Sequence, residues 1–598
     1  MASIELIKEN FDLTGFTTFG IPVKAKYFAE YTSVRELQQI MRTPEYQQNE
    51  VLHIGGGSNL LFIRDFDGFV LRSAIKGLTI YRKNEDTVYL IAGAGEEWTD
   101  LVDYAVENDL AGLENLAGIP GQAGASAIQN VGAYGVEAKD TIFKVEVYDR
   151  LAHKVRTFTN EECRYGYRDS MFKHEAKGRY FVLRVSYRLK PSTIAEHLDY
   201  GPLKALAEKL GHAPTIKEVR DEVLRIRNEK LPDPKVLGSA GSFFKNPVIP
   251  VSYFNGYLTG VAPDVPHYPV DEHWVKVPAG WLIEHAGLKG CRIGGALVYD
   301  KQALVIVNKG NATGESVRAL AEHVALTVKK RYGIWLRPEV NFIDTSVSVE
   351  VLGSGTSKGV PEPACLCDVC TSTDPRDKRQ RASVLVKTHG MTLLIDASPD
   401  LHDQAIQSRL MDVDACLITH QHYDHVGGLD DLRAFGLDKD VPLYCRPNVA
   451  SDLRKRLDYA FRPHPYPGVP NLQLNEIGEE PFYFQGLKIV PINVMHASLP
   501  IVGYRIGPFA YITDAKTIEE SEIEKLQGVK VLIVNALRPC EHFSHFTLQE
   551  ALDFIAKVKP QTAYLTHMSH EMGLHAEVEK KLPENVHLAY DGLKFTVN

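Results

Sequence analysis

The N-terminal part of the chain mixes two hydrophobic periodicities. Apolar residues recur at helical spacing between Ser316 and Tyr332, and Gly333 follows directly, so we predict a helix that ends there. Two further apolar runs, Phe181–Leu189 and Ala303–Asn308, predict strands. Helices and strands do not alternate regularly along this part. The pattern therefore predicts an α+β fold rather than a doubly wound one.

The C-terminal part carries short apolar runs that end at residues with metal-ligand chemistry. Four such runs are predicted as strands: Ala415–Ile418, Leu487–Val494, Tyr511–Asp514 and Ala563–His567. One helix start is also visible, because Thr547 and Glu550 have the spacing of a capping box in front of the apolar segment Leu548–Val558. The chemistry of this part is thus expected at strand ends.

The junction between the two parts lies in the segment Phe342–Val349, which reads FIDTSVSV. One domain's last strand is predicted to run directly into the next domain's first, because no stretch rich in Pro, Gly or Ser separates them. No internal repeat or low-complexity tract relates the two parts. We therefore expect a fusion of two unrelated parts, with the second domain spanning residues 347–598.

Composition narrows the functional classes. A chain of 598 residues is too long for one hydrophobic core, and its 44% hydrophobic and 24% charged residues are typical of folded globular domains. The net charge of -9, without a basic block, disfavours nucleic acid and anionic membranes as partners. No apolar stretch is long enough to cross a bilayer, and the first residues lack a signal-peptide pattern. We expect a cytoplasmic protein that binds no membrane.

Two glycine-rich loops stand out in the N-terminal part. The segment Val51–Phe62 reads VLHIGGGSNLLF, an apolar run that enters three glycines and leaves as another apolar run. The segment Gly118–Gly135 reads GIPGQAGASAIQNVGAYG. Glycine lets backbone N–H groups close on an anion, so either loop suits a pyrophosphate, although a plain tight turn explains the first one equally well. Neither loop has the spacing of a P-loop or a Rossmann fingerprint.

The order of motifs in this part resembles the UDP-N-acetylenolpyruvoylglucosamine reductases, flavoenzymes of peptidoglycan precursor synthesis. The motifs that carry the resemblance include FTTFG from Phe16, YRDSMFK from Tyr167, KLPDP from Lys230, GSFFKNP from Gly241 and RPEV from Arg337. The resemblance implies two FAD-binding lobes, residues 1–70 and 71–230, and a substrate lobe, residues 231–343. It also implies FAD as cofactor, NADPH as co-substrate and UDP-N-acetylglucosamine enolpyruvate as substrate.

The resemblance carries over residue by residue. Ser242 matches the proton donor, while Arg168 and Glu339 match positions that polarise the substrate carboxylate and stabilise the enolate-like intermediate. The residues expected to bind the cofactor are Gly55, Gly56, Gly57, Ser58, Asn59, Gly121, Gln129 and Asn130. Those expected to bind the substrate are Tyr200, Lys230 and Asn246. A flavin oxidase of the same general fold and a non-catalytic nucleotide-sugar binder are the alternatives.

Histidine and aspartate cluster in the segment Thr419–His425, which reads THQHYDH. Imidazole and carboxylate together suit zinc, manganese or iron. The H-x-H-x-D-H pattern resembles the metallo-β-lactamase superfamily, which implies an αββα sandwich and a hydrolase with two divalent ions, zinc or manganese. By that resemblance the ligands are His420, His422 and His496 for one ion, Asp424, His425 and His567 for the other, and Asp514 as a bridge.

Within this superfamily the chain resembles the phosphoribosyl cyclic phosphate phosphodiesterases. The resemblance rests on Gly353–Cys370, on IDASPD at Ile395–Asp400 and on HFSHFTLQEAL from His542. It implies hydrolysis of a small phosphodiester, with His545 serving the phosphate or the leaving group. A lactonase, a thioesterase, an RNA-processing nuclease and a non-catalytic module remain alternatives, and His542 has no predicted role.

Three of the eight cysteines crowd into Cys365, Cys367 and Cys370. Their C-x-C-x-x-C spacing offers three thiolates where tetrahedral structural zinc needs four donors. By resemblance to the related phosphodiesterases, His570 is expected to be the fourth ligand. Free or redox-active thiols are the alternative. The sequence thus predicts a third ion, a structural zinc, in the C-terminal domain.

Overall fold

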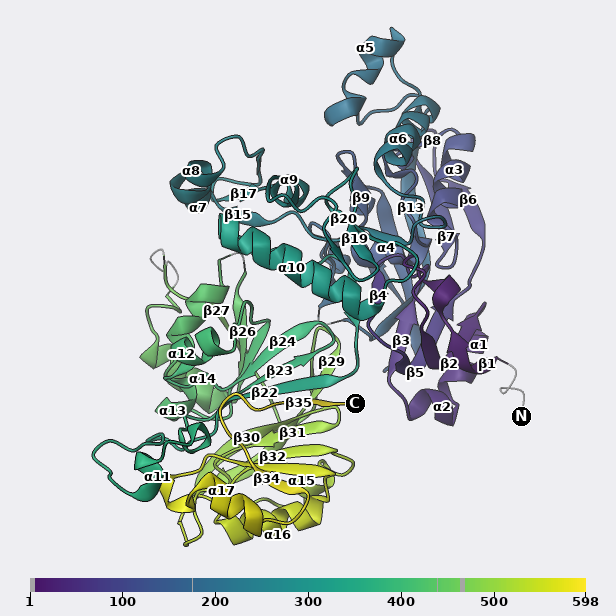
Figure 1. The fold of residues 1–598 in the computed structure, drawn as a ribbon. Coiled ribbons are helices and arrows are strands. Elements are labelled where there is room, and N and C mark those ends of the chain that lie inside the picture. The colour runs from purple at the N-terminus through teal and green to yellow at the C-terminus, as the bar shows by residue number, and fades with distance from the viewer. Residues whose placement is uncertain (1–5, 175, 438, 463–467) are drawn as a thin grey trace. The chain divides into compact units, whose positions relative to one another are not determined.

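The protein folds into two compact units, Met1–Asp344 and Thr345–Asn598, which are described one at a time (Figure 1). The computed structural model describes residues 6–174, 176–437, 439–462 and 468–598. The units meet in sequence between strand β21 (Asn341–Ile343) and strand β22 (Val347–Gly353). Only three residues separate these strands, as the apolar pattern at the junction predicted.

The first lobe of the N-terminal unit is a four-stranded sheet in the order β1-β2-β5-β3. Helix α1 (Val34–Met41) covers it through Leu37, Ile40 and Met41, which pack with Phe69 and Leu71 of β5. The strands are β1 (Ile7–Asp12), β2 (Lys24–Tyr31), β3 (Val51–Ile54) and β5 (Phe66–Ser73). Strand β5 therefore continues past residue 70, where the first lobe was expected to end.

The second lobe is built on an antiparallel sheet in the order β12-β11-β13-β7-β6. Its core is large because three helices bury apolar side chains on one face, including Trp98, Leu101 and Val223. The helices are α3 (Trp98–Glu107), α4 (Ala123–Gln129) and α6 (Ile216–Lys230). The strands are β6 (Leu78–Arg82), β7 (Val88–Gly93), β11 (Ile142–Asp149), β12 (Lys154–Thr159) and β13 (Tyr180–Pro191).

The third lobe packs a four-stranded sheet, β14-β20-β19-β18, against helices α9 and α10. Its helices are α9 (Ala279–His285) and α10 (Gly314–Tyr332), and its strands are β14 (Ser239–Ser242), β18 (Arg292–Ile293), β19 (Ala296–Val298) and β20 (Val305–Asn308). The chain then returns to the first lobe, where β21 pairs in parallel with β4 (Leu60–Phe62). Distant parts of the sequence thus meet beside the first glycine-rich loop.

The C-terminal unit is a sandwich of two seven-stranded sheets, ordered β27-β26-β25-β24-β23-β22-β35 and β28-β29-β30-β31-β32-β33-β34. The strands of the first sheet include β23 (Ser383–Thr388), β24 (Met391–Ile395), β25 (Ala415–Leu417), β26 (Val441–Cys445), β27 (Leu472–Glu476) and β35 (Lys594–Val597). Those of the second are β28 (Phe482–Phe484), β29 (Leu487–His496), β30 (Leu499–Ile506), β31 (Phe509–Ile512), β32 (Val531–Asn535), β33 (Thr562–Thr566) and β34 (Val586–Leu588).

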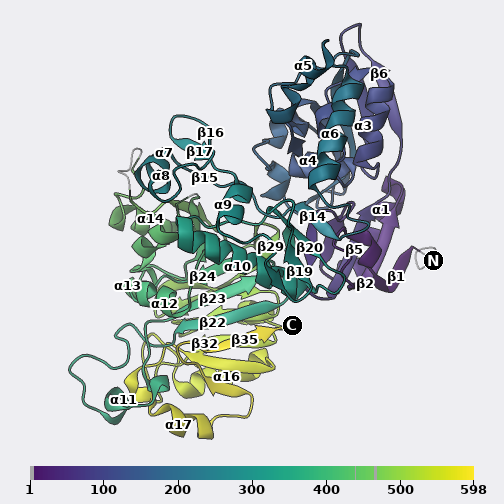
Figure 2. The same ribbon diagram turned by 45° about the horizontal axis from the view of Figure 1, so that its top comes forward.

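Helices cover both outer faces of this sandwich (Figures 1 and 2). On the first sheet lie α12 (Leu401–Gln407) and α14 (Pro447–Arg456), and on the second lie α15 (Glu520–Glu524) and α16 (Leu548–Val558). Three apolar layers result, one between the sheets and one under each set of helices. This is the αββα arrangement expected from the sequence, and the expected α+β fold of the N-terminal unit is present as well.

Predicted elements differ from the structure mainly at their ends. Helix α10 begins two residues earlier than predicted, because Thr313 and Ser316 form a capping box before it. Strand β31 ends at Ile512 rather than Asp514, since Asp514 has a positive φ of 54° that no strand residue adopts. The helix predicted at Leu548–Val558 has those bounds, with the expected capping box.

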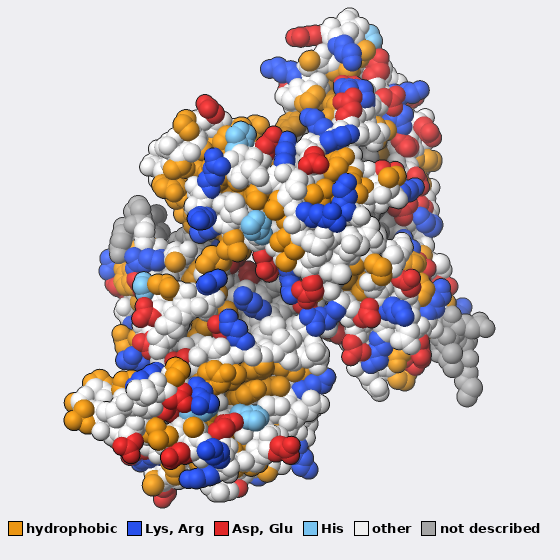
Figure 3. All heavy atoms as spheres, in the orientation of Figure 1, with side chains coloured by type: hydrophobic (Ala, Val, Ile, Leu, Met, Phe, Trp, Pro, Cys, Tyr) orange, Lys and Arg blue, Asp and Glu red, His pale blue; other side chains and the backbone are white. Residues whose placement is uncertain are grey.

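The distribution of charged side chains on the surface and the hydropathy of the helices agree with what the composition indicates. On the face of the molecule drawn in Figure 3, Lys and Arg side chains are interspersed with Asp and Glu side chains. Among the residues that the structure describes, no helix is long and apolar enough to span a bilayer.

Candidate functional sites

The two glycine-rich loops of the N-terminal unit pack directly against each other. The hydroxyl of Ser58 donates to the carbonyl of Pro120 at 3.2 Å. A side chain on Gly56 would approach Cα of Gly121 to 3.1 Å, and one on Gly57 would lie 1.9 Å from the carbonyl oxygen of Phe16. Gly57 also has a φ of +63°. These glycines are therefore required for close backbone approach, and the loops form one continuous surface.

The first loop has the chemistry of an anion cradle. Within the part of the chain that the structure describes, the backbone N–H groups of Gly56, Gly57 and Ser58 have no protein acceptor. Successive unpaired N–H groups form a nest that suits a phosphate oxygen. The side chain of Asn59 is used differently, since it donates to the carbonyl of Glu339 at 3.0 Å. The residues present fit the pyrophosphate of a dinucleotide cofactor such as FAD.

Ser242, Glu339 and Arg168 come together from three distant segments. Ser242 is exposed at the end of β14, and the next residue, Phe243, accepts a hydrogen bond from the backbone N–H of Glu339 at 2.8 Å. The guanidinium Nε of Arg168 lies 2.9 Å from Oε1 of Glu339. The Nη2 of Arg168 donates to the carbonyl of Gly132 at 2.6 Å. The strand end that carries Ser242 is thus joined through the backbone to Glu339, which pairs with Arg168.

The polar residues after helix α4 stabilise the loop. Asn130 is fully buried with a φ of +46°. Its amide donates to the carbonyl of Gly166 and to Glu137, and its carbonyl accepts from the N–H of Lys139. The side chain of Asn130 therefore holds the shape of this loop. The neighbouring Gln129 accepts a hydrogen bond from Lys173 at 3.0 Å.

The predicted substrate residues are spread over the second and third lobes. Tyr200 is half exposed, and its ring meets the ring of Tyr134 edge to face at 6.2 Å. Lys230 is exposed at the last residue of α6. Asn246 accepts a hydrogen bond from the N–H of Ala279, the first residue of α9, at 2.9 Å. Tyr200 and Lys230 are accessible to a ligand, whereas Asn246 also holds a helix start.

The predicted metal ligands of the C-terminal unit converge at strand ends. Strands β24 to β27 are parallel, and so are β31 to β34, so their carboxyl ends meet at one edge of each sheet. The ligands follow β25, β31 and β33, and His496 is the last residue of β29. Asp514 lies at the centre: its Oδ2 is 2.7 Å from Nε2 of His425 and 3.8 Å from Nε2 of His420, and its Oδ1 is 2.9 Å from Nε2 of His567.

The remaining ligands complete two groups around Asp514. The Nε2 of His420 lies 3.0 Å from Nδ1 of His422. Nδ1 of His496 faces two carbonyl oxygens, those of Asp514 and Ser544, both at 2.9 Å, and therefore carries a hydrogen. Its Nε2 then carries a lone pair that is available to a metal. Asp424 approaches His425 and His567 from the other side, at 3.2 and 3.4 Å.

The electrostatics of this cluster fit bound cations. Among the residues that the structure describes, the buried Nε2 of His425 has no hydrogen-bond partner, although carboxylate oxygens of Asp424 and Asp514 lie 3.2 and 2.7 Å away. Burial lowers the pKa of His425, but Asp424, Asp514 and Asp396 outweigh it and raise that pKa well above its ordinary value. Positive charge is thus favoured where the nitrogen lone pair points. Histidine and carboxylate donors at such spacing suit divalent transition metals.

Asp396 is a buried partner of the predicted ligand His425 that the sequence interpretation missed. It follows β24, is fully buried, and its Oδ2 accepts hydrogen bonds from Nδ1 of His425 at 2.7 Å and from the hydroxyl of Thr419 at 2.8 Å. Such a partner sets which ring nitrogen faces a metal. The sequence carried a signal for it, since Asp396 is the first of the two acids in the IDASPD motif and directly follows an apolar run.

His545, predicted to serve the phosphate or the leaving group, lies next to the predicted metal ligands. Its Nε2 is 2.7 Å from Oδ1 of Asp514, and it forms a possible ligand triad with Asp514 and His496. Burial, only partly opposed by Asp514, lowers the pKa of His545 to about 4, so the neutral ring is favoured. The ring of His542 lies beside it, with Nδ1 atoms 3.2 Å apart.

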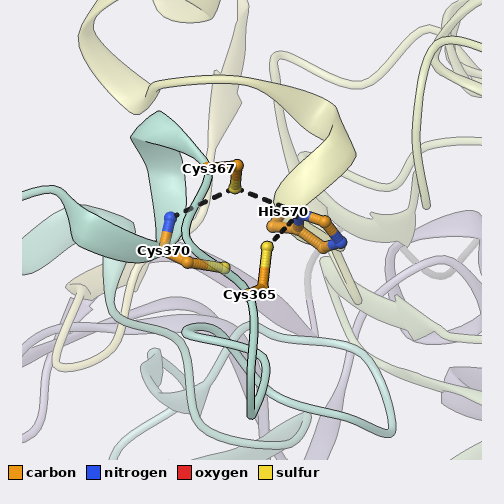
Figure 4. A group of neighbouring side chains, drawn as sticks. All are labelled: Cys365, Cys367, Cys370 and His570. Atoms are coloured by element: carbon orange, nitrogen blue, oxygen red, sulfur yellow. Dashed lines mark hydrogen bonds between the residues drawn. The ribbon is translucent and has the colours of Figure 1, made fainter.

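The cysteine cluster and His570 meet as the sequence predicts (Figure 4). Nδ1 of His570 lies 3.2 Å from Sγ of Cys367 and 3.6 Å from Sγ of Cys365, and Cys370 completes the group. Hydrogen bonds, led by the N–H of Cys370, lower the pKa of Cys367 to about 6. A carboxylate that the sequence did not reveal, Glu362, lies 3.2 Å from Nε2 of His570. The donor set fits tetrahedral zinc with a carboxylate–histidine support.

Known proteins match both units. Residues 25–157 match a model described as FAD binding domain, residues 233–343 match the C-terminal domain of UDP-N-acetylenolpyruvoylglucosamine reductase, and residues 391–568 match the Beta-lactamase superfamily domain. The UDP-N-acetylenolpyruvoylglucosamine reductase of Neisseria gonorrhoeae is 46% identical over 345 residues, which cover 57% of this chain and 99% of the relative. That of Porphyromonas gingivalis is 45% identical over 339 residues, covering 56% and 99%.

Solved structures match each unit as well. One, described as a new diphosphatase from the PhnP family, is 37% identical with a TM-score of 0.40 and covers 42% of this chain and 98% of its own. The UDP-N-acetylenolpyruvylglucosamine reductase of Thermus caldophilus is 26% identical with a TM-score of 0.40, covering 56% and 97%. Both predicted resemblances are confirmed: the chain belongs to the UDP-N-acetylenolpyruvoylglucosamine reductase family and carries, after residue 344, a domain of the beta-lactamase superfamily.

Proposed function

We propose that the N-terminal unit reduces UDP-N-acetylglucosamine enolpyruvate to UDP-N-acetylmuramate with electrons from NADPH, a step of peptidoglycan precursor synthesis. The observation that carries the proposal is the group formed by Ser242, Glu339 and Arg168. When bound, FAD supplies a hydride for C3 of the enolpyruvyl ether and is recharged by NADPH. The loop at Gly56, Gly57 and Ser58 would hold its pyrophosphate.

The chain's own residues supply the proton and the charge stabilisation. The hydroxyl of Ser242 is exposed at the strand end and donates a proton to C2 of the substrate. The guanidinium of Arg168 pairs with the substrate carboxylate, which makes C3 electrophilic and stabilises the charge that develops on the enolate. Glu339 orients that guanidinium at 2.9 Å. Tyr200 and Lys230 bind the nucleotide sugar from the accessible side.

This half of the proposal is tested by spectroscopy of the purified protein. It should be yellow, with FAD bound noncovalently, and should oxidise NADPH only when the enolpyruvyl nucleotide sugar is present. NADPH oxidation that proceeds equally fast with oxygen alone would instead identify a flavin oxidase. Binding of the sugar without turnover would identify a non-catalytic nucleotide-sugar binder.

For the C-terminal unit we infer a metal-dependent hydrolase whose substrate is a small phosphodiester, cyclic or acyclic. The central position of Asp514 between two histidine groups carries the inference. Two divalent ions, zinc or manganese, would be held by His420, His422 and His496 on one side and Asp424, His425 and His567 on the other, and would polarise the phosphate. His545 donates a hydrogen bond to the phosphate or the leaving oxygen.

The substrate of this unit is identified by a screen with the full-length protein loaded with zinc or manganese. The panel holds cyclic and acyclic phosphodiesters, oligonucleotides, lactones and thioesters. Turnover of a small phosphodiester above the others supports the inference. Faster turnover of a lactone, a thioester or RNA would assign one of the other metallo-hydrolase activities. Turnover that disappears with a chelator and returns with added metal would establish the metal requirement.

A third ion, a structural zinc, is proposed for Cys365, Cys367, Cys370 and His570. The support is geometric, since three sulfur atoms and one ring nitrogen surround a common point and Glu362 orients the ring. A closed site of this kind contributes to folding rather than to catalysis.

A further inference from the structure

We propose that Lys173 is a positioning residue of the reductase site, which holds Arg168 in the orientation that meets the substrate carboxylate. The inference rests on the proposed reductase reaction for its kinetic consequences. Its structural basis is independent of that reaction, because it concerns contacts between Lys173 and two neighbouring loops.

The ammonium of Lys173 joins two segments of the site. Lys173 ends a short 3-10 helix, Met171–Lys173, that follows Arg168 along the chain. Its Nζ donates to the backbone carbonyl of Arg168 at 2.8 Å and to Oε1 of Gln129 at 3.0 Å. Gln129 is the last residue of α4, directly before the glycine-rich turn that reaches Gly132. One side chain therefore fixes both the Arg168 backbone and the loop beside it.

The backbone of Arg168 needs such a restraint. Its φ of +54° lies in the left-handed region, which costs a non-glycine residue free energy unless the surroundings impose it. In this conformation the guanidinium reaches the carbonyl of Gly132 and the carboxylate of Glu339. If Lys173 no longer held the carbonyl, the backbone could relax and turn the guanidinium away from Glu339. Displacement by about 1 Å can cost about a hundredfold in rate.

The surroundings of Lys173 disfavour a positive charge on its side chain. Burial, reinforced by the neighbouring Lys245, lowers the pKa of Lys173 to about 8, while Glu339 and Asp169 act in the opposite direction. An ammonium retained in such a place is typical of a group kept for a specific contact. A charge-assisted hydrogen bond to a carbonyl is also stronger than a neutral one.

The test measures both half-reactions of the FAD-loaded full-length protein by stopped flow. Lys173→Met keeps the length of the side chain and removes the ammonium, Lys173→Arg restores a cation, and Lys177→Met is the control, an exposed lysine in the same segment. We expect Lys173→Met to slow flavin reoxidation by the enolpyruvyl sugar about ten- to hundredfold. Flavin reduction by NADPH, which does not involve the substrate carboxylate, should change less than about threefold.

The variants separate positioning from general stability. Lys173→Arg should recover most of the lost rate, and Lys177→Met should match the wild type. Equal slowing of both half-reactions with a lowered unfolding midpoint, or an unchanged rate of reoxidation, would overturn the proposal. If Lys173→Met does not fold, Lys173→Gln takes its place.

A crystal structure of the Lys173→Met variant decides the positioning role whether or not the sugar is the substrate. We expect Arg168 to leave its φ of +54° and its separation from Glu339 to grow from 2.9 Å to beyond about 4 Å, the limit of an ion pair. An Arg168 that keeps both would refute the proposal. A wild-type flavin that the sugar fails to reoxidise would refute the proposed reaction and leave this structural result standing.

Discussion

Nδ1 of His425 lies 2.7 Å from the carboxylate of Asp396, and both side chains are fully buried. The ring nitrogen on the far side, Nε2, is therefore the one that faces Asp514 at 2.7 Å. A carboxylate behind a histidine raises its basicity and fixes its tautomer. Asp396 would therefore support the proposed metal centre without itself being a ligand.

Replacing Asp396 by Asn should weaken metal binding by about ten- to hundredfold, because Asn cannot supply the charge that supports His425. The affinity is measured by competition with a fluorescent chelator, and the metal content by elemental analysis. Asp403→Asn, at an exposed carboxylate paired with His402, is the control and should leave both unchanged. An affinity unaltered by Asp396→Asn would contradict the assigned role.

Replacing Ser242 by Ala should leave flavin reduction by NADPH intact and slow its reoxidation by the enolpyruvyl sugar by about 10²–10⁴-fold, the usual contribution of a proton donor. Stopped-flow absorbance of the flavin follows each half-reaction separately. Similar losses in both half-reactions would remove Ser242 from the role of proton donor.

Replacing His545 by Ala should lower turnover of the C-terminal unit by about 10²–10⁴-fold while two catalytic ions stay bound. His402→Ala, at an exposed histidine of the same unit, is the matched control. Elemental analysis decides between two roles, because His545 lies 2.7 Å from Asp514. Metal content that falls together with activity would make His545 a ligand.

Replacing Cys367 by Ser should remove one zinc ion per chain and lower the unfolding midpoint of the C-terminal unit by about 5 °C or more, since the bound ion contributes to folding. Cys540→Ser alters an exposed thiol outside the cluster and should do neither. The N-terminal unit should keep its flavin and its own transition. An unchanged zinc count would refute the site.

The position of candidate ligands at strand ends could be predicted from the sequence, because it depends only on the order of neighbouring residues along the chain. An apolar run followed at once by His or Asp places that side chain at the edge of a buried sheet, as with Asp514 and His567. The capping box of Thr547 and Glu550 is local too, and the structure contains it. The same rule would have found Asp396 had it been applied to the run before it.

Contacts between distant segments could not be predicted in this way. The pairing of Glu339 with Phe243 joins residues almost a hundred positions apart, and its register is set by tertiary packing. Residue type alone also does not reveal whether a side chain is buried. Asn130 has the polarity of a ligand-binding residue, yet its side-chain hydrogen bonds stay within the protein. The support that Glu362 gives His570 likewise depends on a fold that brings residues 362 and 570 together.

Four side chains with proposed roles, those of Arg168, Asp396, Asp514 and His567, stand on backbone with φ between +54° and +61°. Glycine would relieve the strain at each of these positions and would at the same time erase the chemistry. Selection for thermal stability alone would therefore favour replacements that inactivate one unit or the other. Evolution of this chain toward greater robustness is constrained at the positions on which its activities depend.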